Sequence, residues 1–355
     1  MATREEISSG TMPVRAGLEL DQAALDAYMQ AHVAGFTPPV SIEQFRGGQS
    51  NPTYRLTDGA GKRYVLRRKP PGQLLKSAHA VDREYRIMTA LGNTDVPVPR
   101  THALCEDDSV LGSAFFIMDC VEGRIFWEPW LPALEPAERG AVYDGMNAAI
   151  ARLHMADYEA AGLGDYGKPG NYFARQISRW SRQYLEDEEA GRIEAMDRLI
   201  EWLPENIPPG DETTIVHGDC RIDNMIFHPT EPRVVAFLDW ELSTLGHPLA
   251  DFSYNCLQYR LAPDMFSGMA GLDLPALGIP SEEDYVAAYC ARTGRDGIQS
   301  WDYYIAFNLF RLAAILHGIQ GRVIRGTASS KYAAERGALA GPMAEAAWGE
   351  AQKAM

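Results

Sequence analysis

Cysteine is scarce in this 355-residue sequence: five cysteines are scattered along the chain, and no two show a C-x-x-C spacing. An odd number of cysteines without that spacing argues against a disulfide framework and a zinc site, and it favours a reducing compartment. Long hydrophobic runs are missing too, because no apolar stretch approaches the roughly 20 residues that a membrane-spanning helix needs. The first residues, MATREEISSG, lack the apolar core of a signal peptide. We therefore expect a cytoplasmic protein with no membrane partner.

Basic charge is also in short supply. The chain has 33 Lys and Arg against 48 Asp and Glu, a formal net charge of −15. Because no basic run or basic face offsets this charge, we expect no nucleic-acid partner. The hydrophobic share of 46% is ordinary for a globular protein, and the length is compatible with about two domains. The oligomeric state stays open.

The first third of the chain shows the pattern of short strands and turns that is typical of a small antiparallel sheet. Residues 1–17 are polar and predict a flexible lead-in, after which Asp21 can cap a helix with an apolar stripe over 24–33. Short strands are expected at 42–45, 53–56 and 64–67. The first connection contains Gly47-Gly48-Gln49-Ser50-Asn51, whose backbone N–H groups can approach a phosphate closely while Ser50 adds a hydroxyl. On its own this segment is more often a tight turn.

Helices dominate the rest of the chain. A helix is expected at 78–91, followed by an apolar strand at 114–118 that breaks off into Asp119-Cys120-Val121-Glu122-Gly123. This polar, glycine-ended exit predicts a hinge between a small sheet domain, 18–121, and a mainly helical domain, 122–355. Further helices are expected at 135–154, 172–184, 249–259, 282–292 and 301–318.

One stretch of the second domain contains candidate catalytic and metal-binding residues. Two short apolar runs, 225–227 and 234–238, flank a polar turn and predict a β-hairpin. Asn224 begins the first strand, Asp239 ends the second, and Asp219 stands five residues before Asn224. A kinase needs such a set: one carboxylate to orient the attacking hydroxyl, and an amide with a second carboxylate to hold Mg²⁺ on the nucleotide. The simpler alternative is an Asx-type turn and a strand-end cap.

These residues also carry a resemblance. His217-Gly218-Asp219 followed by Asn224, with Asp239 ending a hairpin, resembles the signature of the aminoglycoside phosphotransferase and choline kinase family, whose fold is similar to that of protein kinases. The likeness extends from about residue 42 to about residue 325. Three sequence segments resemble one branch of this family, which includes the kinase-like domain joined to some acyl-CoA dehydrogenases. They are VLRRKPPG at 65–72, DWELS at 239–243 and GHPLAD at 246–251.

The resemblance implies a fold and a set of roles. The fold is α+β and bilobal, with a small antiparallel β-sheet N-lobe and a mainly helical C-lobe that carries the catalytic hairpin. Asp219 would be the catalytic base, and Asn224 and Asp239 the magnesium ligands. The other implied residues are Gly47, Gly48, Gln49, Ser50 and Asn51 at the phosphates, the backbone of Asp119 and Val121 at the adenine, and His217 and Asp251 in support of the catalytic loop. The cofactors would be ATP and Mg²⁺, with GTP equally open because the hinge contacts are backbone groups.

The sequence departs from the kinase pattern in two places. The third strand presents Arg67 where kinases present a lysine that contacts the α and β phosphates and pairs with a helix glutamate. Arg67 can still pair with Glu84, but an arginine for a lysine is not a neutral swap, and Lys69 is a candidate substitute. The bland alternative is a surface ion pair of little energetic value. The glycine segment also lacks the G-x-G-x-x-G pattern.

The sequence defines the phosphate acceptor less well than the catalytic residues. Only nine residues separate Asp239 from the helix expected at 249, which leaves no platform for a polypeptide and favours a small hydroxylated molecule. Arg311 stands in apolar company and needs a partner, either an internal carboxylate or an anionic substrate. With Gln320 and Arg322 it favours an acyl-CoA or an acid, whereas the net negative charge weighs weakly the other way. Further substrate candidates are Trp240 and Glu241, and an aromatic group of Trp240, Trp301, Tyr303 and Tyr304 that packs in the core by default.

The sequence therefore predicts a small-molecule kinase that transfers the γ-phosphate of ATP to an alcohol group, with a hydroxyacyl-CoA or hydroxy acid as the favoured acceptor. An aminoglycoside or choline-type kinase is the alternative within the same class, and a cleft lined by acids would favour it. A nucleotide-binding pseudokinase with a regulatory role is the alternative from another class, motivated by Arg67 and the altered glycine segment.

Overall fold

The computed structural model describes residues 9–47, 51–70, 80–328 and 332–355. The chain forms two compact units. The first comprises residues up to Trp127 together with 158–163 and 222–243, and the second comprises 128–157, 164–221 and 244–355. The first unit thus extends past residue 121, where the sequence placed the domain boundary, to Trp127, and it also takes in 158–163 and 222–243.

The first unit is built on a six-stranded antiparallel sheet with the strand order β1-β2-β3-β4-β6-β5. The strands are β1 (Thr11–Met12), β2 (Ser41–Phe45), β3 (Thr53–Thr57), β4 (Arg63–Arg68), β5 (Thr101–Cys105) and β6 (Phe115–Asp119). The four strands expected from the sequence are confirmed as β2, β3, β4 and β6.

Two strands of this sheet differ from expectation. Part of the predicted flexible lead-in is instead ordered, because Thr11–Met12 pairs with β2 as an edge strand and the Thr11 hydroxyl donates to Glu43 at 2.9 Å. A polar segment can do this because main-chain hydrogen bonds, which carry no sequence signal, hold an edge strand. Strand β5 was not expected, since it follows the proline-rich segment 96–99 and has only five residues.

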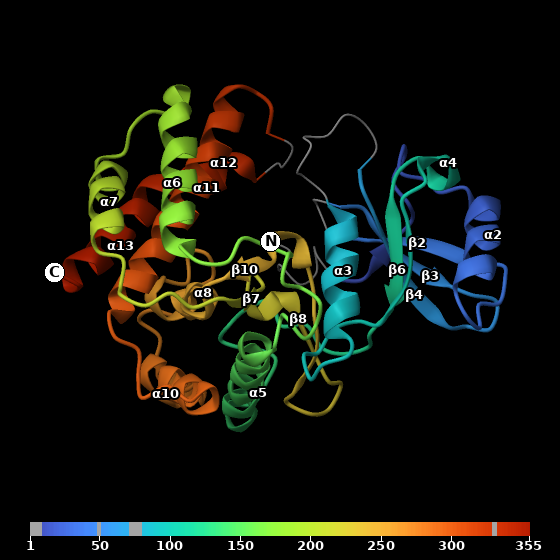
Figure 1. Ribbon diagram of the computed structural model, residues 1–355, viewed down its shortest axis with the longest axis horizontal. Helices are drawn as coiled ribbons and strands as arrows, with labels where there is room; N and C mark the ends of the chain where they lie inside the picture. Colours follow the sequence, from blue (N-terminus) through green and yellow to red (C-terminus); the bar gives the residue numbers. More distant parts are fainter. Residues whose placement is uncertain (1–8, 48–50, 71–79, 329–331) are drawn as a thin grey trace. The chain divides into compact units, whose positions relative to one another are not determined.

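Helices cover both faces of the sheet (Figure 1). Helix α2 (Gln22–His32) begins at Asp21, whose side chain accepts from Ala24 N at 3.0 Å as predicted. Its Tyr28 meets Phe115 of β6, whereas Tyr85 of α3 (Val81–Leu91) meets Phe116. Successive side chains of a strand point to opposite faces, so α2 and α3 lie on opposite sides of the sheet. A short helix, α4 (Asp108–Leu111), joins β5 to β6.

The predicted hairpin is present in the first unit. Strands β8 (Met225–Phe227) and β9 (Val234–Phe237) pair antiparallel, flanked by the 3-10 turns η2 (Ile222–Asn224) and η3 (Trp240–Leu242). A bridge between Arg124 and Phe227 fastens it to the segment after β6. The approach there requires glycine, because a Cβ at Gly123 would lie 2.2 Å from the carbonyl oxygen of Phe227.

The second unit is a helical assembly with a two-stranded ribbon, β7 (Thr214–Val216) with β10 (Thr244–Gly246). The helices are α5 (Pro136–Met155), α6 (Tyr172–Glu186), η1 (Glu188–Ala190), α7 (Glu194–Glu205), α8 (Pro248–Arg260), α9 (Leu274–Leu277), α10 (Glu282–Thr293), α11 (Trp301–Ile324), α12 (Ala333–Gly337) and α13 (Ala340–Lys353). Helix α11 lies at the centre and packs against α6, α7, α8, α12 and α13 (Figure 1). The five helices predicted for this region are confirmed as α5, α6, α8, α10 and α11.

Aromatic side chains fill the centre of the second unit. Phe173 of α6 contacts His247, Tyr303, Tyr304 and Phe307, and each such ring pair adds about 0.5–1.5 kcal/mol beyond area burial. The Tyr303 hydroxyl donates to the carbonyl of Leu203 at 3.1 Å. The core interpretation of Tyr303 and Tyr304 therefore holds, and the cationic-cage alternative does not, because both rings are buried against other aromatic groups.

Trp301, at the start of α11, is similarly engaged, because its Nε1 donates to Glu282 at 2.9 Å. None of the helices in the described ranges is both long and apolar enough to cross a membrane.

Candidate active site

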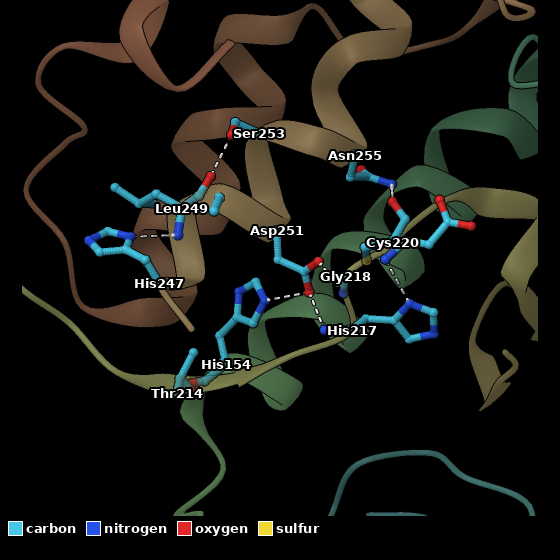
Figure 2. A network of polar contacts seen from close by, with 12 residues as sticks. His154, Thr214, His217, Gly218, Cys220, His247, Leu249, Asp251, Ser253 and Asn255 are labelled. Atoms are coloured by element: carbon cyan, nitrogen blue, oxygen red, sulfur yellow. Dashed lines mark hydrogen bonds and ion pairs between the residues drawn. The ribbon is translucent and has the colours of Figure 1, made fainter. Parts of the chain in front are cut away.

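The loop from His217 to Arg221 follows strand β7 and is held by the first turn of α8 (Figure 2). Asp251 accepts hydrogen bonds from the backbone N–H groups of His217, at 2.7 Å, and Gly218, at 2.9 Å. Gly218 has φ +84°, a conformation that disfavours other residues. The geometry predicted for Asp251, a carboxylate that braces the loop through its backbone, is therefore the one observed.

Asp251 has a second partner on another helix. His154 of α5 places Nε2 3.3 Å from the Asp251 carboxylate and Nδ1 2.8 Å from the hydroxyl of Tyr289 (Figure 2). Burial alone would raise the pKa of Asp251, but the hydrogen bond and charge of His154, with the backbone N–H of His217, outweigh it and hold that pKa below its usual value. The Asp251 carboxylate therefore stays ionised.

Asp219, the predicted base, has two polar neighbours in its own unit. Arg221 Nη2 donates to one carboxylate oxygen at 3.2 Å, and Arg221 Nε lies 3.1 Å from the other. The Tyr254 phenol of α8 also lies near this carboxylate. Burial alone would raise the pKa of Asp219, yet the Arg221 charge and the Tyr254 phenol hold it below its usual value. The side chain keeps 19% of its surface exposed, so it is accessible to a ligand.

His217 supports this loop, as predicted, rather than presenting a free ring. Its side chain is fully buried, and its Nδ1 accepts from the backbone N–H of Asp219 at 3.3 Å. Because Nδ1 acts as an acceptor there, the ring contributes to the shape of the loop.

Among the described residues, Arg311 contacts a backbone carbonyl and an aromatic ring. Its Nη2 donates to the backbone carbonyl of Gly218 at 2.6 Å, and its guanidinium lies 5.3 Å from the centre of the Tyr254 ring. The carboxylate expected as an internal partner is therefore replaced by the backbone of the 217–221 loop, and the contact with an anionic substrate stays a prediction. Arg322 is exposed and lies eleven residues further along α11, about 16 Å at 1.5 Å per residue, so the two arginines do not form one cluster.

The predicted metal pair lies at one end of the hairpin in the first unit. Leu238 N donates to the carbonyl of Asn224 at 2.8 Å, so Asp239 follows directly after the residue that pairs with Asn224. Asp239 adopts φ +65°, a left-handed conformation that costs energy outside glycine and recurs at functional sites.

The donors at this end fit a magnesium ion that is carried by a nucleotide. An amide oxygen and a carboxylate are oxygen ligands of the kind Mg²⁺ takes when phosphate oxygens complete its coordination. Within residues 9–47, 51–70, 80–328 and 332–355, no three His, Cys, Asp or Glu side chains form a cluster that could hold a metal alone. A metal at Asn224 and Asp239 would therefore depend on phosphate ligands.

Arg67 connects this end of the hairpin to the sheet. Its Nε lies 3.0 Å from Glu84 of α3, and its Nη2 lies 2.6 Å from Asp239 and 3.7 Å from Glu241. The Asn51 amide donates to Glu84 at 3.0 Å. The Arg67 and Glu84 side chains are 10% and 2% exposed, which excludes the surface-pair alternative.

Burial shapes the charge of this group. It raises the pKa of Glu84 to about 7, a rise that the Arg67 guanidinium opposes and the Asp239 charge increases. The substitute cation, Lys69, lies just beyond β4 with Nζ 4.0 Å from Asp82. Arg67 is accordingly the cation that faces Glu84 and Asp239.

The remaining predicted residues are those of the glycine segment and of the hinge. Asn51 is buried and Gly47 follows β2, whereas Gly48, Gln49 and Ser50 lie outside the described residues. Asp119 ends β6 opposite Tyr64, and its carboxylate bonds His102 at 2.6 Å. The contacts predicted for Asp119 and Val121 with adenine stay predictions.

Trp240 does not fit its expected role as a substrate contact, and the role of Glu241 stays a prediction. Trp240 is 1% exposed, packs on Phe237 and donates from Nε1 to the Phe237 carbonyl. It therefore belongs to the core of the first unit, because an almost fully buried ring has no surface left for a ligand. Glu241 faces Arg67.

Taken together, a sheet with a buried Arg–Glu pair, a braced His-Gly-Asp loop and a hairpin ending in Asn and Asp define a kinase-like α+β phosphotransferase fold. The sequence profile of the Phosphotransferase enzyme family (APH) matches residues 41–301. The chain belongs to this family, which confirms the resemblance drawn from the sequence.

Individual relatives agree with this assignment. The mouse protein Acyl-CoA dehydrogenase family member 10 is 47% identical over 349 residues, which cover 97% of this chain and 32% of that protein. The chain therefore spans about a third of the length of this curated relative. A crystal structure from Ralstonia eutropha, described as a proposed aminoglycoside phosphotransferase, is 55% identical with a TM-score of 0.87 and covers 94% of this chain and 99% of that one.

A more distant structure shows the fold alone. It is a thermostable mutant of the aminoglycoside phosphotransferase APH(4)-Ia in a ternary complex with ADP and hygromycin B, 14% identical with a TM-score of 0.59. It covers 91% of this chain and 97% of that chain.

Proposed function

We propose that this protein is a small-molecule kinase that transfers the γ-phosphate of ATP, in a magnesium-dependent reaction, to the hydroxyl group of its acceptor. The observation that carries the proposal is the group formed by Arg67, Glu84 and Asp239 beside Asn224. It offers one cation for phosphate and two oxygen donors for a phosphate-bound metal, which is the donor set that phosphoryl transfer requires. The family membership and an ADP-bound neighbour of the same fold support it.

Asp219 supplies the second half of the chemistry in this proposal. It would take the proton of the acceptor hydroxyl while that oxygen bonds to the γ-phosphorus, and the bond from the γ-phosphorus to the β–γ bridging oxygen breaks as ADP leaves. A carboxylate with a lowered pKa suits this task because it is ionised at neutral pH and can accept the hydroxyl's hydrogen bond. When bound, Mg²⁺ would neutralise charge that develops on the phosphates. Asn224 and Asp239 would hold it.

The acceptor in the proposal is a hydroxyacyl thioester or hydroxy acid. The relative named Acyl-CoA dehydrogenase family member 10 aligns with almost the whole chain, which favours an acyl substrate. Arg311 no longer contributes to this choice, because its guanidinium is engaged by Gly218 and Tyr254. An aminoglycoside or choline-type acceptor is the alternative, and the names of the solved neighbours support it.

One observation favours a second function. The Arg67 guanidinium lies 2.6 Å from Asp239, the predicted metal ligand, so a cation already neutralises the group that would hold Mg²⁺. A nucleotide-binding pseudokinase would tolerate that arrangement. Stabilisation by ATP without product from any acceptor would support this second function.

The test compares purified wild-type protein with two variants. Product formation from ATP–Mg²⁺ is followed by ³¹P NMR across a library of hydroxyacyl thioesters, hydroxy acids, aminoglycosides and choline. Asp219→Asn is expected to lower turnover by about a hundredfold or more, because it removes the base. The control, Asp21→Asn, changes an exposed helix cap to an equivalent cap and should leave turnover unchanged. Equal turnover in wild type and Asp219→Asn would contradict the proposal.

A further inference from the structure

Side chains from two helices hold the main chain on both sides of Asp219. Before Asp219, Arg311 of α11 donates to the carbonyl of Gly218 at 2.6 Å. After Asp219, Asn255 of α8 donates from its amide to the carbonyl of Cys220 at 3.1 Å (Figure 2). Arg311 was a candidate from the sequence, whereas Asn255 was not.

The chemistry of the Asn255 amide allows one orientation. A carbonyl can only accept a hydrogen bond, so Nδ2 of Asn255 faces Cys220 and Oδ1 points away from it. Oδ1 accepts from the hydroxyl of Tyr285 of α10 at 3.0 Å, and Nδ2 also lies 3.6 Å from the sulfur of Met146. A rotated amide would place two oxygen atoms against each other at Cys220, so the contact is specific to this arrangement.

Tyr285 is itself held by a third helix. Its carbonyl accepts from Nδ2 of Asn147 of α5 at 2.8 Å, and Oδ1 of Asn147 accepts from Arg292 at 2.9 Å. Asn147, Tyr285, Asn255 and Cys220 are each at most 3% exposed. Because a lost partner would leave a buried polar group unsatisfied, each contact of this network resists displacement.

The Asn255 contact reaches Asp219 through one tight turn of the main chain. Arg221 N donates to the carbonyl of Asp219 at 2.9 Å, so residues 219–221 close a three-residue turn. The Cys220 carbonyl projects from the middle of this turn to Asn255. The amide therefore restricts the movement of the turn that begins at Asp219.

We propose that Asn255 is a positioning residue for phosphoryl transfer, whose amide fixes the turn after Asp219 so that the carboxylate stays where it receives the proton of the acceptor. The inference rests on the proposed function above. Asn255 acts on the base through the main chain of the loop. A displaced base would lose the near-attack geometry on which such a step depends.

The test replaces the amide by an apolar side chain of similar shape. In Asn255→Leu we expect kcat to fall about tenfold to a hundredfold, because a small misplacement of a reacting group has that effect. KM for ATP should be unchanged, since the proposed nucleotide contacts Arg67 and Asp239 lie in the first unit and Asn255 lies in the second.

The matched control is Asn147→Leu. It also removes a buried amide that joins two helices, but the partners of Asn147 lie on α10 and not on the catalytic loop. It should leave kcat close to that of wild type. An equal fall of kcat in both variants would assign the effect to a general loosening of the helices and would overturn the inference.

A second readout does not depend on turnover. Amide hydrogen exchange in the catalytic loop is followed by NMR in wild type and both variants. In Asn255→Leu exchange at Arg221 N–H should rise about tenfold, the equivalent of one hydrogen bond, whereas Gly218 N–H is held by Asp251 and should keep its protection. Unchanged exchange at Arg221 would overturn the inference, whereas absent turnover in wild type together with raised exchange in Asn255→Leu would overturn the proposed function alone.

A variant on the neighbouring helix covers the case in which Asn255→Leu does not fold. Tyr285→Phe keeps the ring and removes the hydroxyl that orients the Asn255 amide. Exchange at Arg221 should then rise and kcat should fall, each by a smaller factor than in Asn255→Leu. The control is Tyr259→Phe, since the buried Tyr259 hydroxyl has no hydrogen-bond partner among the described residues, and it should match wild type. Unchanged exchange at Arg221 in Tyr285→Phe would also contradict the role of Asn255.

Discussion

Arg67 and Arg311 are both buried arginines with different partners. Arg67 lies within 4 Å of three carboxylates, those of Glu84, Asp239 and Glu241, whereas Arg311 contacts a carbonyl and an aromatic ring. A buried guanidinium must be satisfied, but a carbonyl serves as well as a carboxylate when the geometry allows it. The need for a partner was therefore predictable from Arg311 in its apolar helix, and the kind of partner was not.

His247 shows the same principle in a group that titrates. It is buried at the N-cap of α8, where its Nδ1 accepts from Leu249 N at 3.2 Å. Burial lowers the pKa of His247 to about 4. Protonation would also convert the accepting Nδ1 into a donor and so remove the cap. The charged or titratable groups that face the ring are Glu212, Arg295, Asp211 and His154.

The pKa of His247 predicts a loss of stability in mild acid. Because its folded-state pKa lies below the ordinary 6.5, His247 stabilises the fold fully above pH 6.5, and this contribution disappears as the pH falls towards 4. The total is up to about 3 kcal/mol at 1.36 kcal/mol per pKa unit. We expect His247→Asn, which keeps a capping acceptor, to flatten the free energy of unfolding between pH 6.5 and 4, measured by urea denaturation.

The matched control for this measurement is His32→Asn, because His32 is an exposed histidine at the end of α2. It should follow the wild-type curve. Identical pH dependence in wild type and His247→Asn would show that the acid sensitivity arises elsewhere.

At the scale of elements, α8 organises the second unit at both of its ends. Its first turn braces the catalytic loop through Asp251. Its last residue, Arg260, bonds Glu282 of α10 at 2.6 Å, Glu350 of α13 at 2.8 Å and Asp302 of α11 at 3.4 Å. One cation thus ties four helices together, and the position of α8 is coupled to helices far from the loop in sequence.

Removing that cation should cost more than removing a surface one. In Arg260→Met three partly buried carboxylates face each other without their shared partner, which predicts a loss of about 2–4 kcal/mol. The control is Arg182→Met, whose ion pair with Glu186 is 71% exposed on both sides and contributes little. Urea unfolding measures both variants. Equal losses would contradict a special role for the Arg260 network.

At the scale of the whole molecule, the net charge of −15 bears on how an anionic nucleotide arrives. A negative protein repels a negative ligand over distances comparable to the Debye length, and salt screens that repulsion. The association rate constant for ATP–Mg²⁺ should therefore rise by about two- to threefold between 20 and 150 mM salt. Stopped-flow binding measures it, with adenosine as an uncharged comparison. A rate that falls with salt would mean that local cations such as Arg67 govern the encounter.

The sequence by itself determined most of the elements and the family of this protein. Alternating apolar residues defined the central strands, and 3.6-residue periodicity defined α5, α6, α8, α10 and α11, because these patterns arise from which face of an element is buried. The spacing of Asp219, Asn224 and Asp239 was readable because all three lie within 21 residues around one hairpin. Edge strand β1 and helices α7, α12 and α13 were not predicted, because their sequence patterns are weak or because main-chain hydrogen bonds hold them.

Only the tertiary structure decided which residues serve those groups. His154 on Asp251 and Arg311 on Gly218 are contacts between residues that are more than 90 positions apart in the sequence. The burial of Trp240 likewise came from packing, since an aromatic residue beside a metal ligand suits a ligand contact and a core equally well. A pattern records which face of an element is apolar, whereas the partner of a buried polar group depends on what the folded chain brings within about 3 Å of it.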